Sequence, residues 1–590
     1  MPPAPEPPST LSGGPAEPDP DLTLLEAQVH DFRQRYRGQV AQLSGAELLA
    51  ALEELVSLWR TFLGIPEEVL DTEAVWQWLE RRITLQSLLL FFPLELQALP
   101  PEQLAEYRAE PAWLPFRVFL SRLLRQRGHQ QPEPWECLLQ QHYLTGRFAW
   151  QQLWQATLRR PEYHSLEAHT KDTYTFTQLQ GLQTHPSAEI RLAAYQRLHQ
   201  HLEVHADLCG FILSTLVRDH LWEAQWRSYD SPVELYLARH CLSQVAFENL
   251  MEGIRDRVDL FQRYYRLKSR EMGRSIRICD LQAPWEVPGG MADLTLGTTE
   301  ASALVLAALQ EFCPECAAQC KSWLSEEADL PEETGATTPQ VLVQPLLVRI
   351  AWVSRELRAA DPVVWPELED IQASATPAVL GQVHSQFLQL LVLDYLLHSG
   401  RGGRAGSREE LQRGNEVKSA LAHALLIHSL ETQLQAVFCQ SLITRLELIL
   451  YRQGLPEWEK GQTYASWVSE EWLKLCQELC GDAVELMPEH QFHWAGVSEL
   501  FQRPFSAYQA SLSSLMALAW YRRYHLAPRE FIPRYANWLA NPPGSLTLEE
   551  TALVLQVDTA EPDLFLQALE ELESWIETLE EVLEDRPAYR

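Results

Sequence analysis

Apolar residues recur every three or four positions along most of the chain, which is the spacing of an amphipathic helix. The pattern runs from Leu22 to Glu584 and is interrupted at intervals by proline-containing segments. Strict alternation of apolar and polar residues is nearly absent, and residues 341–348 are the best short candidate for a strand. Helix N-terminal capping residues precede four of the periodic stretches, at Ser44, Ser187, Ser231 and Thr547. The pattern predicts an all-α protein with little or no strand.

The first 20 residues lack this periodicity. They are rich in Pro, Ser, Gly and Glu, and they contain neither a basic region nor an apolar stretch. We expect residues 1–20 to be a disordered Pro-rich tail rather than a signal peptide, and a cytoplasmic location follows as the expectation. Two polar segments further along, 326–340 and 399–407, have the composition of loops.

Composition narrows the classes of partner. The chain has 590 residues, of which 46% are hydrophobic and 22% charged, and its net charge is -32. Lys and Arg are scattered rather than clustered, so the charge argues against nucleic acid as a partner. No apolar run is long enough to span a bilayer, so we expect no membrane insertion.

Several short segments carry a recognisable combination of residues. They are, in order, 35–44, 94–100, 144–150, 227–232, 261–268, 280–284, 387–397 and 508–514. Their order, from about residue 22 to 560, resembles the oligoendopeptidase F proteins of the M3 (thimet oligopeptidase-type) family of zinc metallopeptidases. The resemblance implies a two-lobed helical shell around a central channel. It also implies an N-terminal helical domain over residues 21–200 and a peptidase-like domain over 201–590.

The zinc motif of that family is missing from the chain. A peptidase of this type needs His-Glu-x-x-His on a helix, where the two His bind zinc and the Glu polarises the attacking water. The chain has 18 His, and none is followed directly by Glu. By position, the resemblance assigns Trp352 and Glu356 to the two zinc ligands and Val353 to the catalytic Glu. We therefore expect no zinc at these positions.

The other functional positions implied by the resemblance have also changed. The third zinc ligand, a Glu in the family, aligns with Gln382, and a neutral amide is a poor zinc ligand. Positions that bind the scissile carbonyl and its oxyanion in the family align with Ser498, Pro504 and Ser506. Tyr508, at the start of the helix that follows, is the fourth substrate-binding position implied by the resemblance. Metal ligands, general base and oxyanion donors are thus absent together.

Two other kinds of residue cluster could carry chemistry. Cys313, Cys316 and Cys320 have a spacing that predicts three thiols on one helical face, where they could serve a metal or an iron–sulfur cluster. No fourth ligand is evident, and a buried helix face is the simpler interpretation.

Two pairs of His complete the candidates. His423 and His428 lie five residues apart, with Glu431 nearby, so their rings should diverge on a helix. His490 and His493, beside Glu489, could hold a surface metal, but ordinary solvent exposure is the simpler interpretation.

The sequence therefore predicts a catalytically inactive relative of oligoendopeptidase F that binds a peptide or a partner protein. Because the chain is acidic, basic segments are the favoured ligands. One alternative is an active zinc-dependent oligoendopeptidase with an unconventional site. The other is a metal or redox protein built on the three cysteines.

Overall fold

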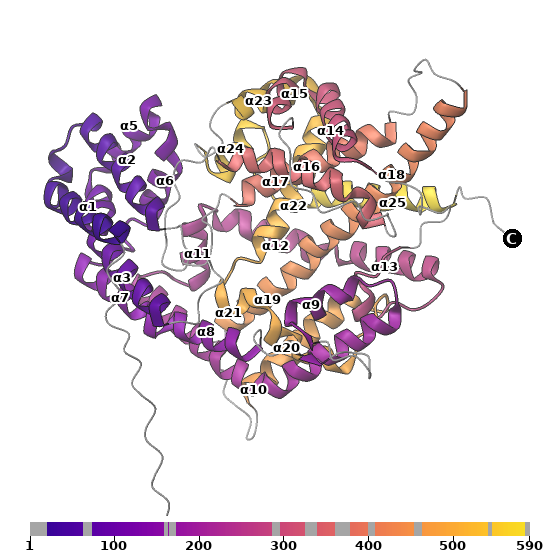
Figure 1. The fold of residues 1–590 in the computed structure, drawn as a ribbon, viewed down its shortest axis with the longest axis horizontal. Coiled ribbons are helices and arrows are strands. Elements are labelled where there is room, and N and C mark those ends of the chain that lie inside the picture. The colour runs from indigo at the N-terminus through magenta and orange to yellow at the C-terminus, as the bar shows by residue number, and fades with distance from the viewer. Residues whose placement is uncertain are drawn as a thin grey trace, which may run out of the picture. The chain divides into compact units, whose positions relative to one another are not determined.

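The computed structural model describes residues 20–62, 73–158, 163–164, 173–285, 296–324, 339–359, 378–398, 408–452, 463–540 and 546–584. These residues are almost entirely helical (Figure 1). The two strands described, β1 (Tyr163–His164) and β2 (Thr173–Tyr174), are two residues each and pair antiparallel. The predicted all-α class is confirmed. The Pro-rich start of the chain and the predicted loop 399–407 lie outside the described residues, as does most of 326–340.

The chain divides into two compact units. The first contains residues up to Pro100 together with Gln131–His142. Its elements are α1 (Pro20–Tyr36), η1 (Val40–Gln42), α2 (Gly45–Phe62), α3 (Glu73–Leu89), α4 (Phe91–Ala98) and most of α7 (Glu133–Thr145). Phe32, Phe91 and Phe92 meet in its core, with ring centroids 5.5–6.1 Å apart.

The second unit contains Pro101–Gln130 and the described residues from Tyr143 onward. Its first half comprises α5 (Pro101–Ala109), η3 (Pro111–Phe116), α6 (Arg117–Arg125), α8 (Arg147–Leu158), α9 (Phe176–Gly181), η4 (Leu182–Thr184), α10 (Ala188–Trp226), α11 (Pro232–His240), α12 (Gln244–Asp256), α13 (Val258–Met272), η5 (Ile278–Asp280), α14 (Thr298–Phe312) and α15 (Pro314–Leu324).

Its second half comprises α16 (Pro339–Ala359), α17 (Ala378–His398), α18 (Arg408–Leu434), the π-helical turn η8 (Gln435–Cys439), α19 (Gln440–Arg452), α20 (Tyr464–Cys480), η9 (Pro488–Gly496), α21 (Ser498–Gln502), α22 (Tyr508–Leu526), α23 (Pro528–Ala540), α24 (Leu548–Val554) and α25 (Leu564–Glu584). A boundary at residue 200, expected from the resemblance, falls inside the continuous helix α10.

The helix starts follow the capping pattern of the sequence. Ser44 and Glu47 bond each other's backbone N–H groups at the start of α2, and Thr547 with Glu550 does the same at α24. Ser231 accepts a hydrogen bond from the N–H of Glu234. Helix α10 begins directly after Ser187, as predicted, although the Ser187 side chain makes no capping bond.

One secondary-structure prediction is wrong. Residues 341–348, the best candidate for a strand, lie within helix α16. Leu342, Val343 and Leu346 are buried there and follow helical spacing against α17 and α18. A run of apolar residues looks the same for a buried strand and a buried helix, so tertiary burial decided the outcome.

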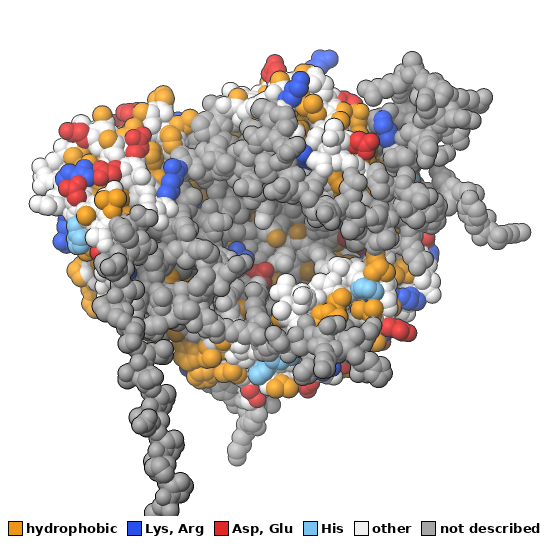
Figure 2. Space-filling model, viewed as in Figure 1, with side chains coloured by type: hydrophobic (Ala, Val, Ile, Leu, Met, Phe, Trp, Pro, Cys, Tyr) orange, Lys and Arg blue, Asp and Glu red, His pale blue; other side chains and the backbone are white. Residues whose placement is uncertain are grey.

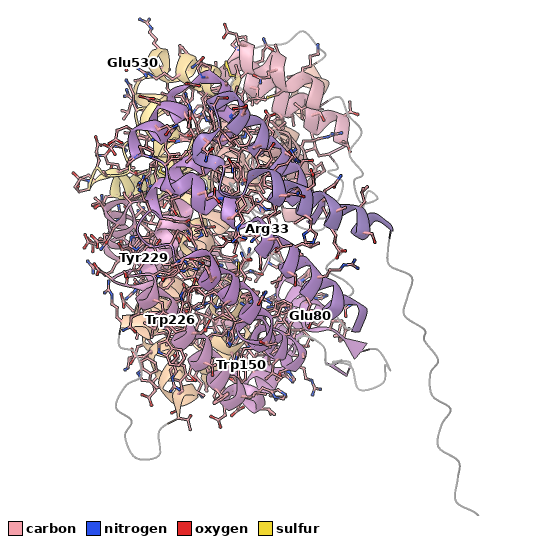
Figure 3. The ribbon with its side chains drawn as sticks, turned by 90° about the vertical axis from the view of Figure 1, so that its left-hand side faces the viewer. Arg33, Glu80, Trp150, Trp226, Tyr229 and Glu530 are labelled. Carbon is pink, nitrogen blue, oxygen red and sulfur yellow. A yellow bond between two sulfur atoms is a disulfide. The ribbon has the colours of Figure 1, made fainter. Side chains whose placement is uncertain are left out.

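Helix α10 is the longest helix of the second unit, and it runs along the lower edge of the view in Figure 1. Helices α8, α20 and the 3-10 segment η9 pack on it. Trp154 of α8 is fully buried and donates a hydrogen bond to the carbonyl of Ala495 over 2.9 Å. Nearer the surface lies Trp150 of α8, which is labelled in Figure 3. Its ring packs against Phe211 of α10 with ring centroids 5.7 Å apart.

The described residues contain no single helix that is both long enough and apolar enough to cross a bilayer. One pair of helices, Leu79–Ala98 and Pro101–Ala109, passes that test together by length and composition alone, and it is sharply bent at the break.

Candidate functional site

Three helices bring together the segments to which the resemblance assigns the zinc site. Ser354 Oγ of α16 lies 3.2 Å from His384 Nδ1 of α17. On the same helix α17, the amide oxygen of Gln382 accepts a hydrogen bond of 3.0 Å from Ser513 Oγ of α22. Helices α17 and α22 lie side by side near the centre of the second unit (Figure 1). The sequence segments 349–356, 381–387 and 508–514 are therefore neighbours in space.

The described side chains at these positions are uncharged. Val353 is completely buried in the core, where the family would carry its catalytic Glu. Gln382 is exposed, and its amide oxygen is engaged by Ser513. Trp352 and Glu356 belong to α16, but their side chains lie outside the described residues. No carboxylate among the described residues of α16 stands where the general base is expected.

The imidazole of His384 lies close to these positions. His384 is buried, and its ring stacks on Tyr535 at 6.1 Å and lies 5.9 Å from Trp538. Burial lowers the pKa of His384 to about 3, so the ring is neutral at physiological pH. Among the described residues, His384 belongs to no group of three side chains that could hold a metal ion. His384 therefore behaves as an aromatic core residue.

Three of the positions that the resemblance assigns to substrate binding are engaged in internal hydrogen bonds. The hydroxyl of Tyr508 lies 2.7 Å from Nδ1 of His240, and Tyr508 is buried. Burial raises the pKa of Tyr508 well above its ordinary value. Ser506 Oγ donates to the carbonyl of Arg503 over 2.6 Å, and Ser498 Oγ donates to the carboxylate of Glu499 over 3.0 Å.

Pro504, the remaining position that the resemblance assigns to substrate binding, is buried and has no hydrogen-bond donor. None of the four positions thus offers a free donor toward a scissile carbonyl.

A buried carboxyl group that the sequence analysis did not identify fixes the turn before α22. Phe505 adopts a left-handed conformation with φ of 53°, and its N–H donates to Glu447 Oε1 over 2.6 Å. Glu447 is 1% exposed, and burial raises its pKa well above the ordinary value, so the group is held protonated. The signal in the sequence is a lone acidic residue between Leu446 and Leu448 on an apolar helix face.

The three cysteines do not form a single helical face. Cys313 precedes α15 in an extended conformation and is joined to Cys316 by a disulfide bond. Cys320 is a separate buried thiol, and burial raises its pKa to about 12. The helical face predicted from spacing is wrong because the chain breaks between α14 and α15 at Cys313 and Pro314.

Glu431, the acidic residue near His423 and His428, has partners other than these two His. Both lie on α18, as expected. The carboxylate of Glu431 instead pairs with Lys268 of α13 over 2.5 Å and accepts a bond of 3.0 Å from the indole of Trp285. Burial lowers the pKa of His428, so that ring is uncharged at neutral pH.

The prediction of solvent exposure is wrong for His490 and His493. His490 is 5% exposed, His493 is partly buried, and both belong to η9, which packs against α10 and α20. His199 of α10, a residue that the sequence analysis did not single out, completes a group of three imidazoles. Separation in sequence hid the group, because His199 lies almost 300 residues before its partners.

The comparisons with known proteins agree with this fold. A family model described as Oligopeptidase F matches residues 95–160. An oligoendopeptidase F homolog of Lactococcus lactis subsp. lactis is 31% identical over 96 residues, which is 16% of each chain. A plasmid-borne oligoendopeptidase F of Lactococcus lactis subsp. cremoris is 26% identical over 149 residues, 25% of each chain. The aligned regions thus span a quarter or less of these curated relatives.

Similarity to solved structures extends over nearly the whole chain. Oligoendopeptidase-F from Enterococcus faecium superposes with a TM-score of 0.71 at 18% identity, covering 96% of this chain and 98% of that one. The structure of PZ peptidase A with an inhibitor gives a TM-score of 0.61 at 13% identity, covering 95% and 98%. These likenesses show the shared fold. The matched N-terminal segment and the shared fold together make this chain similar to the oligoendopeptidase F proteins of the M3 peptidase family.

Proposed function

We propose that this chain is a non-catalytic oligoendopeptidase F-like protein that binds a peptide or an extended segment of a partner protein. The observation that carries the proposal is that none of its 18 His is followed by Glu, so the helical zinc motif of the family exists nowhere in the sequence. The described geometry supports it, since Gln382 pairs with Ser513 and Tyr508 pairs with His240.

The charge of the chain favours basic ligands. The net charge of -32 attracts Lys- and Arg-rich segments and repels acidic ones. On the face shown in Figure 2, acidic and basic side chains are mixed, with no basic patch on the described residues. A cytoplasmic location is part of the proposal, and the eight cysteines of the described residues that remain free support it.

Peptide cleavage tests the loss of catalysis. The full-length protein is incubated with a quenched-fluorescent peptide library, with and without added zinc and a chelator, and Enterococcus faecium oligoendopeptidase-F serves as the active control. We expect cleavage by the control alone. Chelator-sensitive cleavage by this chain would overturn the proposal in favour of an active peptidase with an unconventional site. Bound zinc without cleavage would not overturn the proposal, because a zinc ion can have a structural role without taking part in catalysis.

Peptide binding tests the retained function. Fluorescence anisotropy is measured with labelled decapeptides of basic, neutral and acidic composition, all at the same length. We expect saturable binding of the basic peptide and weaker binding of the acidic one, because of the acidic net charge. The absence of saturable binding by all three peptides would contradict the binding role.

A further inference from the structure

Three buried imidazoles converge where η9 packs on α10. His199 Nε2 and His493 Nδ1 lie 3.2 Å apart. One ring nitrogen from each of His199, His490 and His493 lies within 4.8 Å of the other two. The rings of His490 and His493 have centroids 4.8 Å apart. His199 is 0% exposed and His490 is 5% exposed, so the group is enclosed by protein on most sides.

The three rings are in the chemical form that binds metals. Metal ions bind neutral imidazole, and burial lowers the pKa of His199 to about 3 and that of His493 to about 4. Burial, with the two neighbouring His, also holds the pKa of His490 well below its ordinary value. Nδ1 of His199 lies 2.9 Å from the carbonyl of Tyr195, which can only accept, so that nitrogen carries the hydrogen. Nε2 of His199 therefore presents its lone pair to the other two rings.

We propose that His199, His490 and His493 bind one zinc ion, or another divalent ion with the same preference for imidazole, and so tie α10 to η9. A tetrahedral zinc site has ligand nitrogens about 2.0–2.1 Å from the ion, which separates them from each other by about 3.3 Å. The observed separation of 3.2 Å between His199 and His493 matches that edge. Imidazole is a preferred ligand of zinc, copper and nickel.

The surroundings supply the outer partners that such ligands require. A metal-bound His usually donates its second ring N–H to a carbonyl or another acceptor, which fixes the ring. His199 donates its Nδ1–H to the Tyr195 carbonyl, and the Tyr195 hydroxyl lies 2.9 Å from Nδ1 of His490. Trp472 of α20 stacks on His493 at 5.8 Å and covers the group. Glu489 directly precedes His490 in the sequence. One of its carboxylate oxygens is buried and has no hydrogen-bond partner among the described residues.

Its burial makes this site structural rather than catalytic, because a substrate would have little access to the ion. The metal would hold η9 just before the segment that carries Ser498, Pro504 and Ser506. None of the three His belongs to α16 or α17, so the site is independent of the proposed loss of the family zinc site. The structural zinc site and the loss of catalysis can therefore be tested independently of each other.

Equilibrium dialysis of the full-length protein tests the site. The protein is stripped with a chelator, dialysed against micromolar zinc chloride, and its zinc is measured by mass spectrometry. We expect one zinc per chain in the unaltered protein and a loss of affinity of about a hundredfold or more in the double variant His490→Gln/His493→Gln. We also expect a hundredfold excess of zinc over Kd to raise the melting temperature of the unaltered protein alone, by about 2 °C.

The matched control is the double variant His201→Gln/His205→Gln. These two His lie one turn apart on α10, with ring centroids 4.5 Å apart, and could chelate a metal at the surface by themselves. We expect this variant to keep its zinc. The proposal is overturned if the unaltered protein retains no zinc, if His490→Gln/His493→Gln retains it, or if the control loses it.

A spectroscopic measurement keeps the test decisive if His490→Gln/His493→Gln fails to fold. Zinc-edge X-ray absorption of the unaltered, zinc-loaded protein counts the imidazoles around the metal. We expect three imidazole nitrogens at about 2.0–2.1 Å. Two imidazoles, or any sulfur ligand, would place the zinc elsewhere and refute the site.

Discussion

At the scale of single residues, segments 261–268 and 280–284 each supply a charged side chain that is paired in the interior. Lys268 is 0% exposed and forms an ion pair of 2.5 Å with Glu431, and its ammonium also donates to the carbonyl of Leu281. Asp280 is 0% exposed and accepts hydrogen bonds from Arg191, Arg274 and Arg277. These two segments, which carry part of the family resemblance, therefore have a structural role here.

Asp280 makes the fold sensitive to acid. Burial opposes its ionisation, but hydrogen bonds from Arg274 and Arg191 outweigh burial and lower its pKa to about 2. Its contribution to stability is complete above the unfolded pKa of 3.8 and is lost as pH falls through about 2. We expect Asp280→Asn to cost about 3 kcal/mol at pH 7, because Arg191 loses its buried partner.

Urea unfolding of both proteins from pH 7 to pH 2.5 checks this prediction. The difference in unfolding free energy should shrink by roughly 1.5 kcal/mol at pH 2.5, because the unfolded chain binds a proton at Asp280 below about pH 3.8 and the folded chain only near pH 2. Asp482→Asn is the control, since Asp482 pairs with Arg266 at the surface and should change stability little. A difference in unfolding free energy that stays constant from pH 7 to pH 2.5 would contradict the role of ionised Asp280 in stability.

The pair Lys268–Glu431 predicts strong non-additivity. Lys268→Met alone leaves the Glu431 carboxylate buried with the hydroxyl of Tyr264 and the indole of Trp285 as its remaining donors. We expect a loss of about 3–5 kcal/mol from that single change. The double change Lys268→Met/Glu431→Gln removes both charges and should recover more than half of the loss. Denaturant unfolding of the four proteins measures the coupling, and additive losses would refute it.

At the scale of elements, the crossing of α10 and α20 depends on one glycine. Gly210 lies inside α10, and a Cβ added there would come within 2.9 Å of the Ala465 Cβ and 3.0 Å of its backbone. Backbone atoms cannot move aside as a flexible side chain can. The closeness of the two helices, and with it the support of η9 by both, thus requires the missing side chain.

Gly210→Ala should therefore destabilise the protein although alanine is the better helix former. The change gains about 1 kcal/mol in helix propensity, and overpacking costs about 1–3 kcal/mol with backbone shifts in addition. The matched control is Gly181→Ala at the end of α9, where an added Cβ meets nothing within 4 Å. Thermal unfolding should show a lower melting temperature for Gly210→Ala only. Equal melting temperatures would mean that the helices separate without cost.

At the scale of the whole molecule, the acidic net charge acts over distances longer than any one contact. A charge of -32 raises the local concentration of basic ligands, and salt screens that attraction within a Debye length of about 8 Å at physiological ionic strength. Binding that rests on the summed charge should therefore weaken continuously with salt.

We expect the affinity for the basic decapeptide to fall by about tenfold or more between 0.05 and 0.5 M salt, as screened attraction is lost. Anisotropy titrations at four salt concentrations measure the slope, and the neutral peptide is the control. An affinity for the basic peptide that does not depend on salt would show that local contacts dominate.

The sequence by itself determined the helical class and several helix starts. Helical periodicity and the capping residues at Ser44, Ser231 and Thr547 are local properties, so they can be recognised without knowledge of the fold. The order of short motifs indicated the family. The missing His-Glu pair is likewise decided by sequence alone, because it depends on adjacent residues.

Only the tertiary structure decided which distant residues meet. It showed that residues 341–348 are helical, that Tyr508 is engaged by His240, and that Glu447 is buried against Phe505. It also placed His199 beside His490 and His493, which looked like exposed residues in sequence. Burial and pairing depend on how elements pack, and packing joins residues that the chain keeps hundreds of positions apart.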